Sequence, residues 1–182
     1  MAKWAEVPLG SGRLKRELLI WKLWDEAHLP EYGSKWAACF DLKASLRRGD
    51  KVKVYGQQNH SANRNIDDCE SFVLYSGERA LVPTGLIFDL DKDASLRIHP
   101  RSGLSLKNGI VVANCEGMVD ADYVNQTYIM LHNISDELFH IKNGDRIAQG
   151  EVVKSEQVEF VIADREPESK TDREGGFGST GV

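Results

Sequence analysis

The residues of this sequence best suited to catalysis are the carboxylates of Asp120-Ala121-Asp122-Tyr123. This segment follows Gly117, and a strand-like run resumes at residues 126–131, so the pattern predicts a β-hairpin with carboxylates at its bend. A carboxylate fixed near a phosphorus atom can orient a water molecule and remove its proton for attack. The alternative is a structural turn with Tyr123 as a core ring, because Asp is common in turns.

Two further segments carry groups that bind phosphate. Arg101-Ser102-Gly103 follows a strand-like run, and residues 104–108 could form one helical turn. A guanidinium, a hydroxyl and a glycine amide at a helix start form a compact phosphate receptor, although a structural turn with Ser102 as helix N-cap is the alternative. Gly144-Asp145-Arg146 begins a strand that includes Gln149. A turn followed by a surface or ion-paired arginine is the structural interpretation of that segment.

Asn114 and the chain end complete the candidate binding residues. Asn114 could offer its amide to the edge of a base, or satisfy backbone groups inside a hairpin. Residues 173–182 place one aromatic ring and two hydroxyls among four glycines. Such a segment is suited to wrapping anions, with a disordered terminus as the alternative. The five histidines lack ligand spacing, and no Ser or Cys nucleophile is paired with a base, so covalent catalysis is not indicated.

Many short β-rich runs, mostly separated by Gly, Asn, Asp or Pro, must position these groups. Their spacing of about 8 to 12 residues favours an antiparallel barrel or jelly roll. Residues 18–24 could form a helical face or a strand buried on both sides, and we favour the strand. Residues 49–79 are polar and predict long loops around one or two strands. The runs lie at residues 81–82, 86–88, 96–98, 110–112, 128–131, 138–141, 147–153 and 158–162.

Composition limits the class of protein. The 182 residues, 41% hydrophobic, fit one domain with extensions. The formal net charge of -5 argues against a broad nucleic-acid-binding surface. Three cysteines without ligand spacing indicate neither a disulfide framework nor structural zinc, which favours a reducing, cytoplasmic location. No apolar run approaches the about 20 residues that span a bilayer, so we expect no membrane association.

The order of these segments resembles the trimeric dUTPases. The resemblance covers about residues 17–46 and 78–182. Within it, residues 77–86 are similar to the connecting strand of the family. The five motifs of the family correspond to residues 29–42, 100–104, 114–123, 144–149 and 173–181.

The resemblance implies an all-β jelly-roll β-barrel in a homotrimer, with active sites shared among subunits and a flexible Gly-rich C-terminal tail. It implies hydrolysis of dUTP to dUMP and pyrophosphate, which limits uracil incorporation into DNA and supplies dUMP. Asp120 would hold the water that attacks the α-phosphorus, and Asp41 would reach Mg²⁺ through the water shell of the ion. The residues implied to bind substrate are Arg101, Ser102, Gly103, Asn114, Gly117, Met118, Val119, Tyr123, Gln149, Arg173, Phe177, Ser179 and Thr180.

We therefore expect residues 1–162 to form the jelly roll, with an N-terminal extension at 1–16 and a long insertion at 47–77. Residues 163–182 would be a linker and a lid over the active site. Two other functions remain open. A dCTP deaminase would share the fold but need a different second motif with a glutamate base. A dUTP-binding regulatory protein could use the insertion to dock on a partner.

Overall fold

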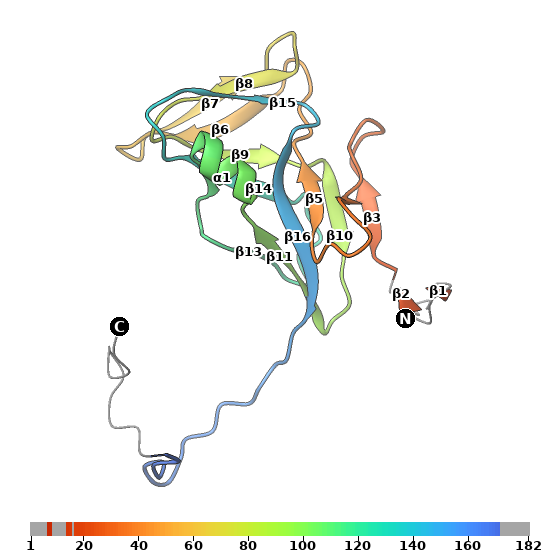
Figure 1. Cartoon of the computed structure of the whole chain (residues 1–182), viewed down its shortest axis with the longest axis vertical. Helices are drawn as coiled ribbons and strands as arrows, with labels where there is room; N and C mark the ends of the chain where they lie inside the picture. The colour runs from red at the N-terminus through yellow and green to blue at the C-terminus, as the bar shows by residue number, and fades with distance from the viewer. Residues whose placement is uncertain (1–6, 9–13, 16, 172–182) are drawn as a thin grey trace.

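Antiparallel strands make up almost all of the regular structure in this computed structural model, which describes residues 7–8, 14–15 and 17–171 (Figure 1). Two five-stranded sheets carry most of the fold. Sheet I has the order β13-β11-β16-β5-β4, and sheet II has the order β12-β14-β9-β6-β7. Sheet I consists of β4 Glu31–Tyr32, β5 Phe40–Lys43, β11 Ala94–His99, β13 Gly117–Val119 and β16 Arg146–Lys154. Sheet II consists of β6 Lys51–Tyr55, β7 Ser61–Asn65, β9 Arg79–Pro83, β12 Ile110–Val112 and β14 Tyr128–Asn133.

Smaller elements surround the two sheets. Three two-stranded sheets pair β3 Leu19–Lys22 with β10 Leu86–Asp89, β8 Ser71–Leu74 with β15 Phe139–Lys142, and β1 Val7–Pro8 with β2 Leu14–Lys15. The helix α1, Ser102–Asn108, follows β11, as the sequence predicted. None of the helical structure in the described ranges is long and apolar enough to cross a bilayer.

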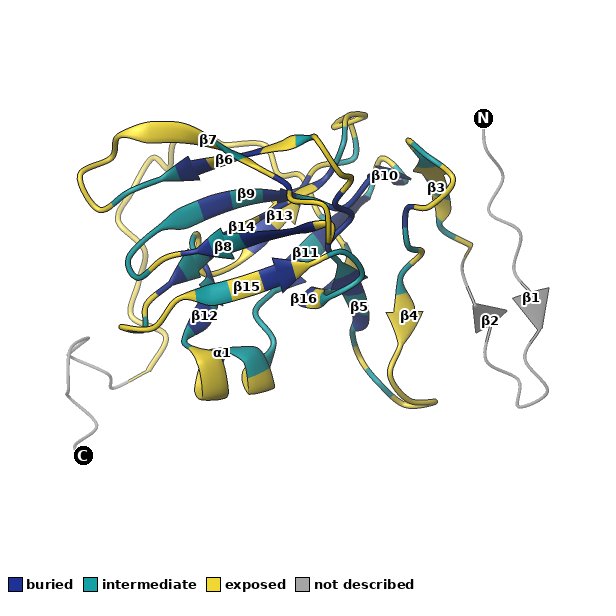
Figure 2. Ribbon diagram, turned by 90° about the horizontal axis from the view of Figure 1, so that it is seen from above, coloured by how far each residue is buried: buried dark blue, intermediate teal, exposed yellow. Residues whose placement is uncertain are grey.

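The core lies between the two sheets, and buried residues recur along most of their strands, whereas β4 and β7 are largely exposed (Figure 2). Leu42 and Leu96 of sheet I and Val82 and Leu131 of sheet II have no exposed surface. Burial of these apolar side chains is the main stabilising contribution to the fold. Gly150 lets β16 approach its neighbours, because a Cβ there would lie 2.9 Å from Phe40 Cε2 and 3.0 Å from Leu96 Cδ1.

The prediction of a strand at residues 18–24 is confirmed by β3, but its burial on both faces was wrong. β3 lies at the side of the molecule and pairs only with β10 in the described structure. Leu19, Trp21 and Leu23 therefore remain exposed, at 55%, 69% and 41%. An apolar run cannot by itself show whether both of its faces find a partner within the chain.

The segment at residues 49–79 is more ordered than predicted, because it contributes β6, β7 and β8 rather than one or two strands. The Arg64 guanidinium on β7 fixes it to the fold with two hydrogen bonds to the Glu78 carboxylate, at 2.5 and 2.9 Å, and one to the Val73 carbonyl at 2.6 Å. This pair raises the pKa of Arg64 and lowers the pKa of Glu78 through the shared hydrogen bonds. Polar β7 is thus held at the edge of sheet II by its one part-buried arginine.

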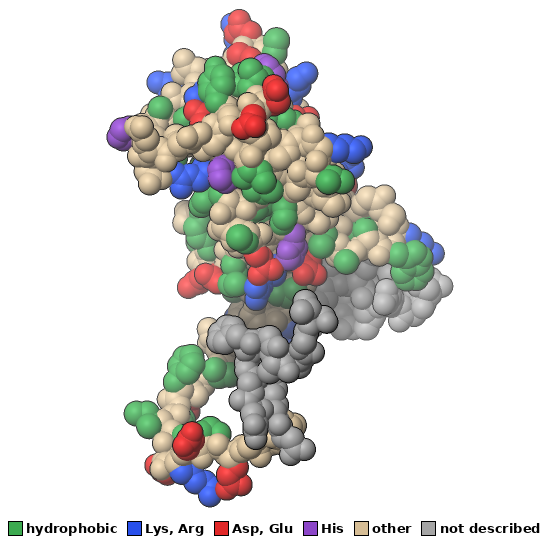
Figure 3. Space-filling view, turned by 60° about the vertical axis from the view of Figure 1, so that its left-hand side comes forward, with side chains coloured by type: hydrophobic (Ala, Val, Ile, Leu, Met, Phe, Trp, Pro, Cys, Tyr) green, Lys and Arg blue, Asp and Glu red, His purple; other side chains and the backbone are tan. Residues whose placement is uncertain are grey.

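The predicted strand at residues 158–162 does not form. After β16 the chain leaves the body of the molecule (Figure 1), and residues 156–171 contain no helix or strand and are exposed throughout. The apolar side chains of this arm stand free in Figure 3, with Phe160 and Ile162 exposed at 93% and 94%. No strand of the described part of the chain lies beside the arm to pair with it, and strand formation depends on such a partner.

Candidate active site

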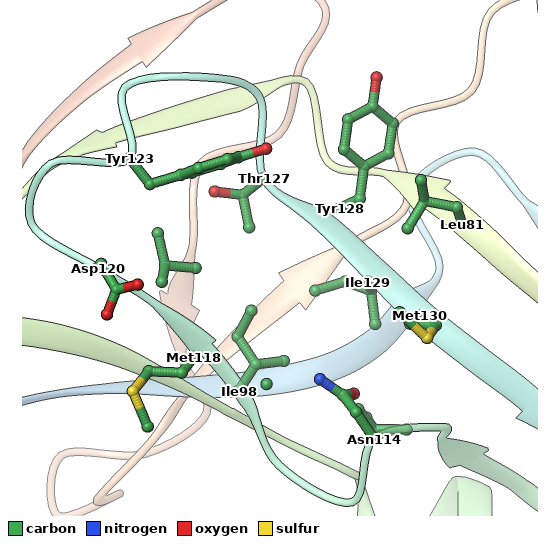
Figure 4. Close-up of a pocket in the computed structure, with 13 residues that line it drawn as sticks. Leu81, Ile98, Asn114, Met118, Asp120, Tyr123, Thr127, Tyr128, Ile129 and Met130 are labelled. Carbon is green, nitrogen blue, oxygen red and sulfur yellow. The ribbon is translucent and has the colours of Figure 1, made fainter.

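A pocket of about 250 Å³ opens where β13 of sheet I and β14 of sheet II diverge (Figure 4). Both sheets line it: Ile98 and Val119 come from sheet I, and Leu81 and Ile129 from sheet II. The part of the pocket wall that these four residues form is therefore apolar. Six residues that the sequence predicted line this pocket, namely Asn114, Gly117, Met118, Val119, Asp120 and Tyr123.

Asp120 follows β13 directly, and its side chain is exposed at the rim of the pocket (Figure 4). The predicted hairpin at this point was wrong, because β13 pairs with β11 in sheet I whereas β14 pairs with β9 in sheet II. The connection instead crosses from one sheet to the other, and the Tyr123 amide closes a turn on the Asp120 carbonyl at 3.1 Å. This crossing holds the sheets apart and leaves the carboxylate facing the space between them.

Tyr123 forms one end of the pocket rather than part of the core, so the core-ring alternative was wrong. Its side chain is 40% exposed, and its hydroxyl donates to the Gln126 carbonyl at 3.0 Å. This hydrogen bond fixes the position of the Tyr123 ring relative to the turn that contains it. The ring presents a flat apolar surface beside Asp120 (Figure 4).

Asn114 lies at the opposite end, in the turn between β12 and β13 (Figure 4). The alternative of a buried Asn was wrong, because the residue is exposed. The turn is tight: the Glu116 amide donates to the Asn114 carbonyl at 2.7 Å, and Cys115 adopts a left-handed φ of 63°. Gly117 then brings bare backbone to the pocket floor, since a Cβ there would lie 3.1 Å from Ile98 Cβ.

The pocket wall formed by β9 and β14 was not predicted from the sequence. Thr127, Tyr128 and Met130 line the pocket together with Leu81 and Ile129. Their residue types are ordinary for a strand, so the only available signal was their position directly after the Asp120 turn. Which sheet that strand joins depends on pairing with β9, more than 40 residues earlier in the chain.

A second cluster, here called the arginine cluster, surrounds Asp41 on the outer side of sheet I. Arg101 Nε lies 2.9 Å from Asp41 Oδ1, and Arg146 Nη1 lies 3.2 Å from Asp41 Oδ2. Gln149 pairs with Asp41 across β16 and β5, and its side chain donates to the Pro100 carbonyl at 3.0 Å. The ion-pair interpretation of Arg146 is therefore confirmed.

Ser102 and Gly103 open α1 beside this cluster and are exposed. The N-cap is Arg101 and makes no side-chain capping bond, so the interpretation of Ser102 as N-cap was wrong. Exposed amides and a free hydroxyl next to a guanidinium suit an oxyanion such as phosphate. Four other predicted residues, Arg173, Phe177, Ser179 and Thr180, lie outside the described residues.

Strand register shows that the pocket and the arginine cluster are far apart within one chain. Asp41 pairs with Gln149, which pairs with His99 on β11, so three strand spacings separate Asp41 from β13. Asp120 lies level with Ser95, four residues from His99 along β11. With strands about 4.8 Å apart and residues about 3.3 Å apart, Asp41 and Asp120 are about 20 Å apart.

No group of three or more potential metal ligands occurs within residues 17–171 or the short N-terminal pairs. Asp41 has both carboxylate oxygens engaged by guanidinium groups. A carboxylate paired in this way fits contact with a Mg²⁺ ion through a water molecule, while phosphates of a ligand bind the ion directly. Hard cations prefer oxygen ligands, and Mg²⁺ keeps several of its waters.

The Cys39 thiol, two residues before Asp41, gives no sign of a nucleophile. Burial, together with the negative charge of Glu151, raises the pKa of the Cys39 thiol. The group therefore stays protonated at neutral pH, and the thiolate rather than the thiol is the reactive form. All three cysteines are free.

Comparison with known proteins identifies the family. The family model described as dUTPase matches residues 55–181. The chain belongs to the dUTPase family. A deoxyuridine 5'-triphosphate nucleotidohydrolase of Nautilia profundicola is 39% identical over 168 residues, which cover 91% of this chain and 99% of the relative. The enzyme of the same name from Treponema denticola is 38% identical over 162 residues, covering 88% and 96%.

Solved dUTPase structures share the fold. The dUTPase of Staphylococcus bacteriophage 80alpha, a mutant with dUpNHpp, matches with a TM-score of 0.71 at 21% identity and covers 91% of this chain and 99% of the phage chain. The dUTPase of Streptococcus mutans matches with a TM-score of 0.58 at 22% identity, covering 75% and 92%. The prediction of an all-β jelly roll of the dUTPase type is confirmed.

Proposed function

We propose that this chain hydrolyses dUTP to dUMP and pyrophosphate, which would remove dUTP from the DNA precursors. The observation that carries the proposal is the exposed Asp120 carboxylate at the rim of a pocket with Tyr123 at one end and Asn114 at the other. A carboxylate there can hold a water molecule toward the innermost phosphorus of a bound nucleotide. The deoxyuridine 5'-triphosphate nucleotidohydrolases to which the chain is 38–39% identical support the same substrate.

The pocket suits a deoxynucleoside in one orientation. The Asn114 amide and the backbone at Gly117 and Met118 would read the hydrogen-bonding edge of uracil. Tyr123 would pack under the deoxyribose and leave no space for a 2′-hydroxyl. This arrangement puts the 5′ end of the sugar, and hence the α-phosphate, toward Asp120.

The arginine cluster suits the triphosphate. Arg101 can exchange its pair with Asp41 for a phosphate oxygen, and Ser102, Gly103 and Gln149 offer further donors beside it. Asp41 would then be free to meet the water shell of Mg²⁺, a metal that a solved dUTPase of phage phi11 is described as coordinating in a structural role. Such an ion would neutralise charge on the phosphates as the bond to the α-phosphorus breaks.

A homotrimer accounts for the separation between the two clusters. Neighbouring phosphates of one nucleotide are only a few ångström apart, so Asp120 and Arg101 of one chain cannot serve the same molecule across about 20 Å. The pocket of one subunit would therefore meet the arginine cluster of another. Residues 163–182 would supply the linker and the lid, in which Phe177 stacks on uracil and Arg173, Ser179 and Thr180 hold the outer phosphates.

Asp120→Asn tests the assignment of the base. We expect pyrophosphate release from dUTP to fall by about 10²- to 10⁴-fold, the usual contribution of a positioned base, while dUTP still binds. Asp122→Asn is the matched control, because Asp122 is an exposed carboxylate of the same turn that does not line the pocket. Its activity should stay close to the native rate. Unchanged turnover in Asp120→Asn would refute the assignment.

The same assay separates the rival functions. Native protein is incubated with dUTP, UTP, dCTP or dTTP, each with Mg²⁺ and with chelator, and both pyrophosphate and ammonia are measured. Pyrophosphate from dUTP alone, lost with chelator, supports the proposal. Ammonia from dCTP would indicate a deaminase. Tight dUTP binding without turnover would indicate a regulatory protein.

A further inference from the structure

Thr127 has a buried hydroxyl whose hydrogen-bonding capacity the protein does not use. The residue directly precedes β14 and is 1% exposed. Its backbone is fixed, because its amide donates to the Leu86 carbonyl at 2.8 Å and its carbonyl accepts from the Thr84 amide at 3.2 Å and the Thr84 hydroxyl at 2.6 Å. The Thr127 hydroxyl itself has no hydrogen-bond partner among the described residues. A buried polar group in that state destabilises the folded protein unless something else satisfies it.

The position of this hydroxyl sets it apart from the other unpaired groups. Within the described ranges, the buried side-chain atoms without a partner are His28 Nε2, Arg97 Nε, Gln126 Nε2 and Thr127 Oγ1. Of these four residues, Thr127 is the one that lines the pocket. Its neighbour Thr84 is equally buried but fully engaged, since its hydroxyl donates to Thr127 and accepts from the Leu86 amide. An unsatisfied donor at a ligand pocket indicates a bond that the ligand completes.

We propose that Thr127 is a further substrate-binding residue, whose hydroxyl pairs with the 3′-hydroxyl of the bound deoxynucleotide. The inference rests on the function proposed above. Figure 4 shows Thr127 directly beside the Tyr123 ring, at the end of the pocket near Asp120 and away from Asn114. With the base at Asn114 and the α-phosphate at Asp120, the sugar lies against Tyr123 and next to Thr127. A deoxynucleoside triphosphate has one free sugar hydroxyl, at the 3′ carbon.

Packing alone does not explain the residue. Valine has nearly the same shape and would fill the same space without leaving a polar group unpaired. Packing therefore leaves the hydroxyl of Thr127 unexplained. Because the backbone of Thr127 is fixed, the hydroxyl is preorganised, and little conformational freedom is lost when the substrate binds.

The test measures coupling between the Thr127 hydroxyl and the 3′-hydroxyl. Native protein, Thr127→Val and Thr127→Ser are assayed with dUTP and with 2′,3′-dideoxyuridine triphosphate. We expect Thr127→Val to lower kcat/KM for dUTP by about 3- to 10-fold, the usual size of a neutral hydrogen bond, but to change it less than about twofold for the dideoxynucleotide. Thr127→Ser, which keeps the hydroxyl, should recover most of the activity with dUTP.

Equal losses with both nucleotides would overturn the proposal, because the hydroxyl would then act without reference to the 3′ position. Failure of dUTP hydrolysis in the native protein would instead refute the proposed function, and calorimetric binding of dUMP and 2′,3′-dideoxy-UMP would then measure the same coupling without turnover. Thermal denaturation without nucleotide checks the fold. Thr127→Val should melt no lower than native protein, whereas the matched Thr84→Val, which loses two hydrogen bonds, should melt lower.

Discussion

Mixing two inactive variants should restore activity if each site takes Asp120 from one subunit and Arg101 from another. In the proposed mechanism Asp120→Asn removes the base and Arg101→Ala removes a guanidinium that would bind phosphate, so each variant alone should be inactive. In mixed trimers a site is intact when one contributing subunit keeps Asp120 and the other keeps Arg101. For random assembly at equal concentrations, each condition holds in about half of the cases, so about a quarter of the sites should be active.

Recovery of activity in mixed assemblies is expected because Asp120 and the arginine cluster of one chain are far apart. Asp120 and the arginine cluster lie about 20 Å apart on sheet I, by three strand spacings and four residues along β11. A loop movement cannot close this distance, because both groups are tied to strands of the same sheet. The geometry of a single chain therefore predicts that the two variants complement each other only when they assemble together.

The assay is pyrophosphate release after the variants are unfolded together and refolded, with mixing verified by native mass spectrometry. The matched control replaces Arg101→Ala by the double variant Asp120→Asn/Arg101→Ala. No subunit in that mixture carries Asp120, so no site can recover. Verified mixed trimers without activity would refute the shared site and would require Asp120 and Arg101 to act within one chain.

Two predictions concern the scaffold that holds the site. Glu78→Gln should lower the free energy of unfolding at pH 7 by about 2 kcal/mol, because it removes the carboxylate charge and replaces one acceptor of the Arg64 guanidinium by an NH₂ donor. The pKa of Glu78 is lowered in the folded protein, so the contribution of Glu78 to stability is present above the ordinary pKa of 4.5 and is lost as pH falls through the lowered pKa. Urea unfolding between pH 7 and pH 3 should therefore show the stability difference between native protein and variant shrinking as pH falls. A constant difference in stability would contradict this. Gly150→Ala should cost about 1–3 kcal/mol by urea unfolding, since its Cβ would meet Phe40 at 2.9 Å, and a variant of native stability would show that β16 can shift.

Local patterns in the sequence were sufficient to locate most strands and the functional turns. The runs at 81–82, 96–98 and 110–112 are strands, as predicted from short β-rich runs between turn residues. Asp120 and Asn114 lie in turns beside one pocket, as expected for glycine- and asparagine-punctuated segments.

Long-range pairing is what the sequence did not reveal. The residues after Asp120 were expected to fold back on β13, yet they join β9 in the other sheet. The choice depends on contacts across more than 40 residues, which no local spacing encodes. Thr127 could not be predicted for the same reason. Its importance comes from its place across the pocket from residues of sheet I and from its unpaired hydroxyl, and both depend on the three-dimensional fold.

The failed strand at residues 158–162 and the active site that we propose to be shared between subunits have a common physical explanation. Both contain groups that find no partner among the described residues of one chain: Phe160 and Ile162 are almost fully exposed, and the arginine cluster is about 20 Å from Asp120. An apolar segment of high strand propensity becomes a strand only where a neighbouring strand accepts it. A second copy of the chain would provide such an edge and a second arginine cluster together. We therefore expect variants that remove the apolar side chains of residues 158–162 to weaken assembly and activity in parallel, because the same contact between subunits would support both.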